Sequence, residues 1–210
     1  MILGLLLLGG CTADRATAYA AALQSGDCAA LPWSDLRDDC AVEHLQCALT
    51  VAEPARWECA FREAERDRDP AQCARAGVWA DDCRLHLWAG SFEQWAPKSP
   101  RPGEDEARVA TELARFGFAE GDPRPWSAWY RYIHGHSRPL DRGACAQVSD
   151  PALAEACRQT ALAHYGDMLN VARDRKLYPC TGGALPSFLE YTPDPDIDAL
   201  RKSRTDLCPP

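Results

Sequence analysis

The chain has 210 residues, 26% of them charged and 9% aromatic, and a formal net charge of -8 at pH 7. This acidic balance, together with the absence of a long basic run, argues against nucleic acid as a partner. About 200 residues remain after a short apolar leader, which is enough for one domain or two small ones.

An unbroken apolar run, Ile2 to Leu8, opens the chain. It is much shorter than the roughly 20 residues that a helix needs to cross a bilayer, and it matches the apolar core of a secretory signal. Leu8-Gly9-Gly10-Cys11 then places two small residues before a cysteine, an order that resembles the lipobox of bacterial lipoproteins. The resemblance implies that the leader, residues 1–10, is removed. It also implies that Cys11 carries fatty acyl chains such as palmitate, which hold the protein on a membrane.

The same resemblance implies a location in the cell envelope. Thr12 stands where lipoproteins of the enteric inner membrane have aspartate, so we expect the outer membrane of a Gram-negative bacterium. No Lys or Arg precedes the apolar run, although such leaders usually carry one. The alternative interpretation is a buried N-terminal helix in which Cys11 is incidental.

Short helices separated by glycine and proline are predicted for the first half of the chain. They are expected at 14–25, 27–31, 34–51, from 54 onward, at 70–77 and at 79–88. Asp14 and Ser34 are suited to cap the first and third of these helices, and Gly26 and Gly77 to end the first and fifth. Pro54 lies in the first turn of its helix, where proline is tolerated.

The second half begins with a proline-rich segment, residues 96–103, which we interpret as a linker or crossing loop. Helices are expected at 104–118, at 126–133, at 150–176 in two or more parts, and at 195–204. No stretch alternates convincingly between apolar and polar residues, and Val and Ile are scarce. The chain is therefore predicted to be all-α, with Cys-rich helical hairpins at 11–95 and a C-terminal helical subdomain at 104–210.

Ten cysteines remain when Cys11 is set aside: Cys28, Cys40, Cys47, Cys59, Cys73, Cys83, Cys145, Cys157, Cys180 and Cys208. An even number outside the cytoplasm indicates a disulfide framework. Zinc is the competing interpretation, but zinc sites use short paired spacings such as C-x2-C, and the chain has none. The same absence argues against a thioredoxin-like redox motif and a c-type haem site, so no cofactor is predicted.

A repeat suggests how these cysteines pair. Four of them are each followed by alanine and then, ten or twelve residues later, by a second cysteine. Twelve residues of straight helix would hold two Cα atoms about 18 Å apart, whereas a disulfide needs less than about 7 Å. A proline or glycine lies between the two cysteines of every pair and permits the chain to reverse. We therefore predict disulfides 28–40, 47–59, 73–83 and 145–157, which leaves 180–208.

The predicted helix 34–51 carries both Cys40 and Cys47. One uninterrupted helix would hold these two residues about 10 Å apart, so they are not expected to pair with each other. Being seven residues apart, they share a helix face, and the helix could be stapled to a neighbour at each end. The expected architecture is a set of disulfide-stapled helical hairpins, packed as a small helical array or bundle.

Three histidines form the one candidate metal site. His134 and His136 alternate near the end of a predicted helix, and His164 lies elsewhere in the sequence. Two imidazoles on a glycine-containing turn can ligate a metal if a third donor arrives. The favoured interpretation is a solvated loop without a metal.

Aromatic residues form the one candidate binding surface. Trp126, Trp129, Tyr130 and Tyr132 could line a groove for a peptide or a sugar, since aromatic side chains supply large contact areas. The first three, with Ile133, form a stripe at helical spacing, which more often belongs to a core. Tyr132 lies off the stripe and is expected to be the most exposed.

These patterns predict a non-enzymatic envelope lipoprotein that presents a rigid helical surface to another envelope protein. The membrane is its second expected partner, through the lipid. A lipid-anchored enzyme or metal-binding protein using His134, His136 and His164 is the alternative, and it requires these three side chains to gather. A purely structural envelope component is a third hypothesis.

Overall fold

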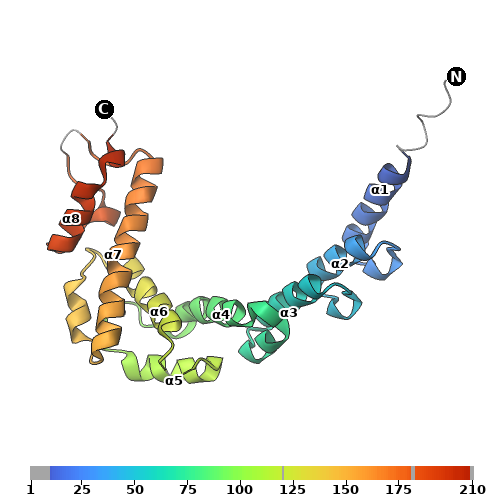
Figure 1. Ribbon diagram of the computed structural model, residues 1–210, viewed down its shortest axis with the longest axis horizontal. Helices are drawn as coiled ribbons and strands as arrows, with labels where there is room; N and C mark the ends of the chain where they lie inside the picture. The colour runs from blue at the N-terminus through green and yellow to red at the C-terminus, as the bar shows by residue number, and fades with distance from the viewer. Residues whose placement is uncertain (1–9, 120, 181–182, 209–210) are drawn as a thin grey trace. The chain divides into compact units, whose positions relative to one another are not determined.

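The computed structural model describes residues 10–119, 121–180 and 183–208, and for residues 10–13 the backbone alone. As predicted, the fold is all-α, and the described residues contain no β-strand beyond an isolated bridge between Leu140 and Tyr191. None of the helices in this part combines the length and apolarity that a membrane span requires. The chain divides into two compact units, unit 1 up to Leu87 and unit 2 from Trp88 (Figure 1).

Short helices make up unit 1, and each α-helix after the first is preceded by a 3-10 helix. The elements are α1 (Gly10–Ser25), η1 (Cys28–Ala30), α2 (Ser34–Glu43), η2 (Cys47–Leu49), α3 (Glu53–Asp67), η3 (Pro70–Trp79) and the start of α4 (Ala80–Trp95). The division between the units falls inside α4, whereas the sequence suggested 96–103. The physical reason is that Trp88 and Phe92 belong to the aromatic core of unit 2.

The repeat seen in the sequence is a 3-10 helix followed by an α-helix. The first cysteine of each pair lies in the 3-10 helix, and the second lies in the α-helix that follows. Cys40 and Cys59 are each the seventh residue of their α-helix. Between the two helices the backbone is extended at Leu31 and Thr50, and this short extended link lets the chain turn back.

The prediction of one uninterrupted helix from Ser34 to about Val51 is wrong, because α2 ends at Glu43. Leu45 adopts a left-handed conformation with φ 54°. The amide of Gln46 donates to the Ala41 carbonyl at 2.7 Å, and the amide of Leu45 donates to the Val42 carbonyl at 3.2 Å. These two bonds form a Schellman motif that closes the helix without the usual glycine. Cys47 therefore lies in a separate 3-10 helix.

Hydrogen bonds join the first two repeats of unit 1. The Asp38 carboxylate on α2 is buried and accepts hydrogen bonds from the backbone amides of Val51 at 2.8 Å and Ala52 at 2.9 Å. These amides lie just before α3, where Ala52 is the N-cap, so the carboxylate fixes the chain at the point where the helix begins. In the other direction, Gln46 donates to the Gly26 carbonyl at 2.6 Å, in the turn after α1. The repeats are thus joined by more than the chain itself.

Unit 2 contains the longest described helix, α7, and a larger core. Its further elements are α5 (Glu106–Phe116), α6 (Pro123–His136), η4 (Gly143–Gln147), α7 (Pro151–Asp174), η5 (Ser187–Leu189), α8 (Pro195–Ser203) and η6 (Thr205–Leu207). The expectation that 150–176 forms two or more parts is wrong, since α7 is one continuous helix of 24 residues. Asp122, Asp150 and Asp194 each precede a proline and accept backbone amide hydrogen bonds, and so cap α6, α7 and α8.

Two apolar clusters stabilise unit 2. The larger one joins α4, α5, α6 and α7 around buried aromatic rings, and Trp129 lies 5.1 Å from Trp95 and 5.4 Å from Phe92 between ring centroids. The second lies between α7 and the C-terminal segment, where the Tyr165 hydroxyl donates to the Leu189 carbonyl at 3.2 Å. The orange and red ribbons of Figure 1 show α7 and α8 side by side, as their contacts also indicate.

Candidate functional site

The predicted lipidation residue lies outside the part of the chain whose side chains are described. Backbone is given for Cys11, but not its side-chain surroundings. The lipid anchor at Cys11 and the leader at 1–10 therefore remain predictions.

The other ten cysteines form five disulfides, and these are the five predicted pairs. Their Cα–Cα distances run from 5.4 to 5.7 Å, within the range that disulfides normally span. Cys28, Cys40, Cys59, Cys73, Cys83, Cys145 and Cys157 are buried, while Cys47 and Cys208 are partly exposed and Cys180 is exposed. The bonds staple four 3-10 helices to the α-helices that follow them and join the C-terminal segment to the residues after α7.

His134 is not part of a solvated loop but is 1% exposed, which corrects the favoured interpretation for this residue. Its Nε2 atom lies 3.5 Å from the Cys157 sulfur and 3.8 Å from the Cys145 sulfur. Burial lowers the pKa of His134 to about 4, against a hydrogen bond with the Cys157 backbone that acts in the opposite direction. The imidazole is therefore neutral at pH 7 and acts as a packing partner of the disulfide.

The other two candidate histidines have separate surroundings. The ring of His136 is exposed, and its Nδ1 atom donates to the Tyr132 carbonyl at 2.8 Å, one helical turn earlier. His164 is half-buried on α7, and its pKa is lowered by burial and by the nearby charges of Arg131 and Arg138. Among the described residues, the side-chain groups close enough to share an ion do not unite His134, His136 and His164. The three-histidine site is thus not assembled.

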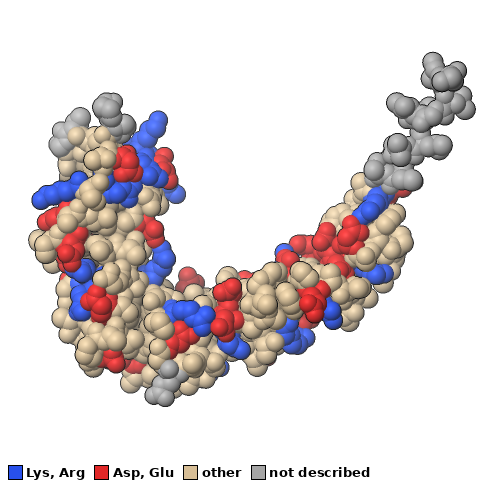
Figure 2. Space-filling view, viewed as in Figure 1, with Lys and Arg blue, Asp and Glu red and all other residues tan. Residues whose placement is uncertain are grey.

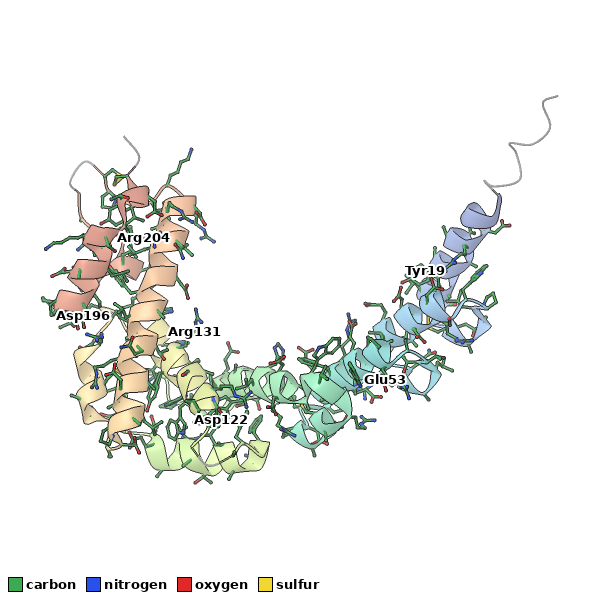
Figure 3. All side chains as sticks on the ribbon, viewed as in Figure 1. Tyr19, Glu53, Asp122, Arg131, Asp196 and Arg204 are labelled. Carbon is green, nitrogen blue, oxygen red and sulfur yellow. A yellow bond between two sulfur atoms is a disulfide. The ribbon has the colours of Figure 1, made fainter. Side chains whose placement is uncertain are left out.

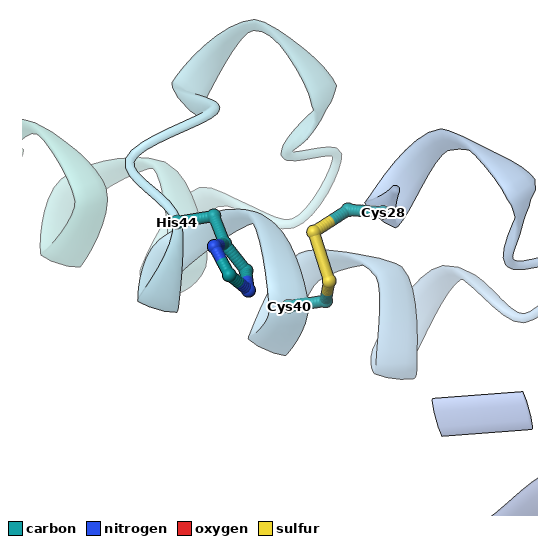
Figure 4. Close-up of side chains that lie close together, drawn as sticks. All are labelled: Cys28, Cys40 and His44. Carbon is teal, nitrogen blue, oxygen red and sulfur yellow. A yellow bond between two sulfur atoms is a disulfide. The ribbon is translucent and has the colours of Figure 1, made fainter. Parts of the chain in front are cut away.

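A second histidine beside a disulfide was not anticipated from the sequence. Figure 4 shows the ring of His44, just after α2, next to the bond between Cys28 and Cys40. Its Nε2 atom donates to the Leu23 carbonyl at 2.8 Å, so the ring links α2 to the end of α1. Metals bind cysteine as a free thiolate, whereas both of these sulfurs are bonded to each other. The arrangement therefore serves packing, as at His134.

The aromatic residues of α6 belong mainly to the core, as the helical spacing favoured. Trp126, Trp129 and Tyr130 are buried, and Tyr132 is half-buried, with its ring 5.1 Å from Phe92. Burial raises the pKa of Tyr130, and its hydroxyl has no hydrogen-bond partner in the described residues. These side chains are therefore not available as an open groove.

Surface hollows occur instead on unit 1. One hollow, with a volume of about 430 Å³, lies between α3 and the start of α4, and we call it the α3–α4 hollow. It is lined by Glu58, Phe61, Arg62, Glu65, Trp79 and Asp82. A second of about 420 Å³, the α2–α3 hollow, is lined by Tyr19, Asp35, Asp38, Asp39, Val42, Glu43, Ala52, Pro54, Ala55 and Glu58. Glu58 lines both, so the two hollows adjoin.

Seven carboxylates line these two hollows, whereas the one cationic residue that lines them is Arg62. Arg62 is already paired, at 2.9 Å, with both Glu43 and Glu58. Figure 2 shows red acidic side chains gathered over the helices of unit 1, and Figure 3 labels Tyr19 on α1 and Glu53 at the start of α3, near this surface. The pKa of Tyr19 is raised by burial and by the charges of Asp39 and Glu43.

The two hollows were not predicted from the sequence. Acidic residues are visible in the sequence, but the grouping of these carboxylates needs α2, α3 and α4 to pack together. Comparison of the chain with protein-family models, with curated proteins and with solved structures gave no match.

Proposed function

We propose that the chain is an exported, lipid-anchored protein of the bacterial cell envelope that acts as a non-enzymatic interaction module. The single observation that carries the proposal is the complete pairing of ten of its eleven cysteines, which leaves Cys11 as the one outside these bonds. Disulfides persist outside the cytoplasm, so this pairing agrees with export. The position of this eleventh cysteine at the end of an apolar leader agrees with lipidation.

Rigidity supports an interaction role over a catalytic one. Each staple restricts a short loop, and the repeats of unit 1 are also joined through Asp38 and Gln46. A stapled surface loses little conformational entropy when a partner binds, which favours affinity. The alternative that uses His134, His136 and His164 lacks comparable support, because His134 is packed against a disulfide.

Metabolic labelling with a fatty-acid analogue tests the anchor. Protein made in its own cell should carry the label and fractionate with the outer membrane, and Cys11→Ala should lose both properties. A matched control, Cys47→Ser/Cys59→Ser, should remain labelled, because it removes two cysteines distant from the leader.

Thiol titration of the same preparation tests the compartment. Denatured, unreduced protein should react at none of the ten paired positions. Protein that keeps its leader, or in which several of these thiols are free, would contradict the proposal.

A further inference from the structure

The adjoining hollows of unit 1 combine an apolar floor with an acidic rim. In the α3–α4 hollow, Phe61 and Trp79 are half-buried and supply apolar surface, while Glu65 and Asp82 are polar lining residues. Trp79 is held in place by Trp57, at 6.1 Å between ring centroids in an edge-on arrangement. Aromatic faces of this kind attract the cationic groups of lysine and arginine.

The net negative charge of unit 1 favours a positively charged ligand. Residues 1–87 hold 14 acidic side chains and 8 arginines and no lysine, so they carry six of the eight net negative charges of the chain. Asp39 and Asp82 form no ion pair among the described residues, and Asp39 is exposed. Such a surface attracts cations and repels nucleic acid and anionic lipid headgroups.

The spacing of the carboxylates indicates an elongated cation and not a single ion. The clusters of side chains in the described residues that are close enough to chelate one metal ion consist of cysteine and histidine, and none contains a carboxylate of these hollows. The acidic groups are thus spread along the surface, where several separated positive charges can meet them. The aromatic floor favours a ligand whose charges sit on aliphatic stems, as in lysine and arginine side chains.

We propose that the two hollows, joined at Glu58, form one docking groove for a lysine- or arginine-rich segment of a partner protein. This inference rests on the proposed function and specifies the chemistry of its partner. The segment places cationic groups between the carboxylates of both hollows and lays aliphatic stems on Phe61 and Trp79.

Fluorescence anisotropy with the oxidised full chain tests the groove. The probe is a labelled twelve-residue peptide of alternating lysine and alanine, and the reference is the same peptide with glutamate in place of lysine. We expect saturable 1:1 binding of the lysine peptide and none of the glutamate peptide. The triple variant Glu58→Gln/Glu65→Gln/Asp82→Asn should weaken binding about tenfold, since the loss of each exposed charge pair lowers the affinity about twofold.

A charge-matched control separates the groove from general acidity. Glu93→Gln/Glu104→Gln/Glu190→Gln removes three exposed carboxylates of unit 2 and should change the affinity less than about twofold. Phe61→Ala should weaken binding several-fold while circular dichroism stays unchanged. Equal losses in both triple variants, or displacement of the peptide by spermine at equal charge concentration, would overturn the inference, because either result indicates charge attraction without a groove.

The two proposals fail separately. A chain that carries lipid at Cys11 and has no free thiols, yet does not bind the lysine peptide, would refute the docking groove and leave the proposed function standing. A chain that binds the lysine peptide but never receives lipid at Cys11 would refute the proposed function and leave the docking groove standing.

Discussion

Unit 1 and unit 2 are stabilised in different ways. The largest fully buried side chains of the described residues all belong to unit 2: Trp88, Trp129, Tyr130, Tyr165, Phe92, Ile133, Leu140, Leu169, Leu189, Ile197, His134 and Val109. In unit 1 the buried apolar residues are mostly cysteine and alanine. Three of the five disulfides lie there. Where each helix packs only against its neighbours, covalent staples replace a large core.

Reduction of the disulfides should produce the largest difference in stability between the two units. The three loops span ten or twelve residues and each staple is worth about 3 kcal/mol, so together they supply roughly 9 kcal/mol, comparable with the net stability of a whole domain. Excess dithiol at neutral pH should therefore unfold unit 1 while unit 2 keeps its aromatic core. Hydrogen exchange read by mass spectrometry, peptide by peptide, measures this difference.

Two double variants, one in each unit, test the contribution of a single disulfide. Cys47→Ser/Cys59→Ser should accelerate exchange in α2 and α3 only, and Cys145→Ser/Cys157→Ser should leave most of the unit 2 core protected. Faster exchange of unit 2 than of unit 1 after reduction would contradict the comparison.

Removing a core aromatic should affect unit 2 more than unit 1. Trp129 is 1% exposed and packs against Phe92 and Trp95, so Trp129→Ala should cost about 3–5 kcal/mol. Trp33→Ala in unit 1 removes a half-buried ring that contacts Arg15, and should cost roughly 1 kcal/mol. Denaturant unfolding followed by tryptophan fluorescence measures both, and equal costs would refute the difference in core size.

Acid should destabilise unit 2 through His134. The pKa of His134 is about 4 in the folded chain, whereas an unperturbed histidine, as in the unfolded chain, has a pKa of 6.5. The unfolded chain therefore takes up a proton first as the pH falls. Stability should therefore decline between about pH 6.5 and pH 4, by roughly 3 kcal/mol in total. Urea unfolding at several pH values measures the slope, which His134→Gln should remove and His136→Gln should keep.

A pair of glycines gives the smallest expected effect. Gly77, in η3, has φ 57° and ψ -125°, and a Cβ there would lie 2.3 Å from the Trp57 Nε1 atom. Gly77→Ala should cost about 2 kcal/mol. Gly90 lies inside α4 with nothing near its Cβ position, so Gly90→Ala should stabilise by about 0.5–1 kcal/mol. The midpoint of thermal unfolding should fall for Gly77→Ala and rise for Gly90→Ala. A shift of both midpoints in the same direction would show that the strain at Gly77 is absent.

Local patterns could be predicted because their geometry lies within a dozen residues. Four disulfide pairs follow from cysteine spacing and an intervening breaker, and the Asp-Pro pairs cap helices by short-range hydrogen bonds. The positions at which helices end were harder to predict from the sequence. Leu45, Arg68 and Lys176 all adopt left-handed φ values of 54–55°, although this conformation costs a non-glycine residue about 1–2 kcal/mol. Schellman hydrogen bonds after each of these helices offset that cost. Because no glycine marks these three helix ends, the sequence gives no signal for them.

The candidate sites show the same limit. The stripe of Trp126, Trp129 and Tyr130 was expected in a core because its period is helical, and it is buried. His134 carried no such signal, since its neighbour is a disulfide formed by residues 11 and 23 positions later. The hollows of unit 1 need side chains from α1 to α4, so no single helix contains their pattern.

The order of residues by itself determined the all-α class, the five cysteine pairs and the aromatic stripe of α6. Backbone geometry and helical period act over short distances, and so they can be deduced from spacing alone. Only the packed structure decided that the units divide inside α4, that the three candidate histidines do not form one metal site and that the carboxylates of unit 1 surround two adjoining hollows. Those features depend on which distant side chains share a surface, and that is set by the packing of whole helices.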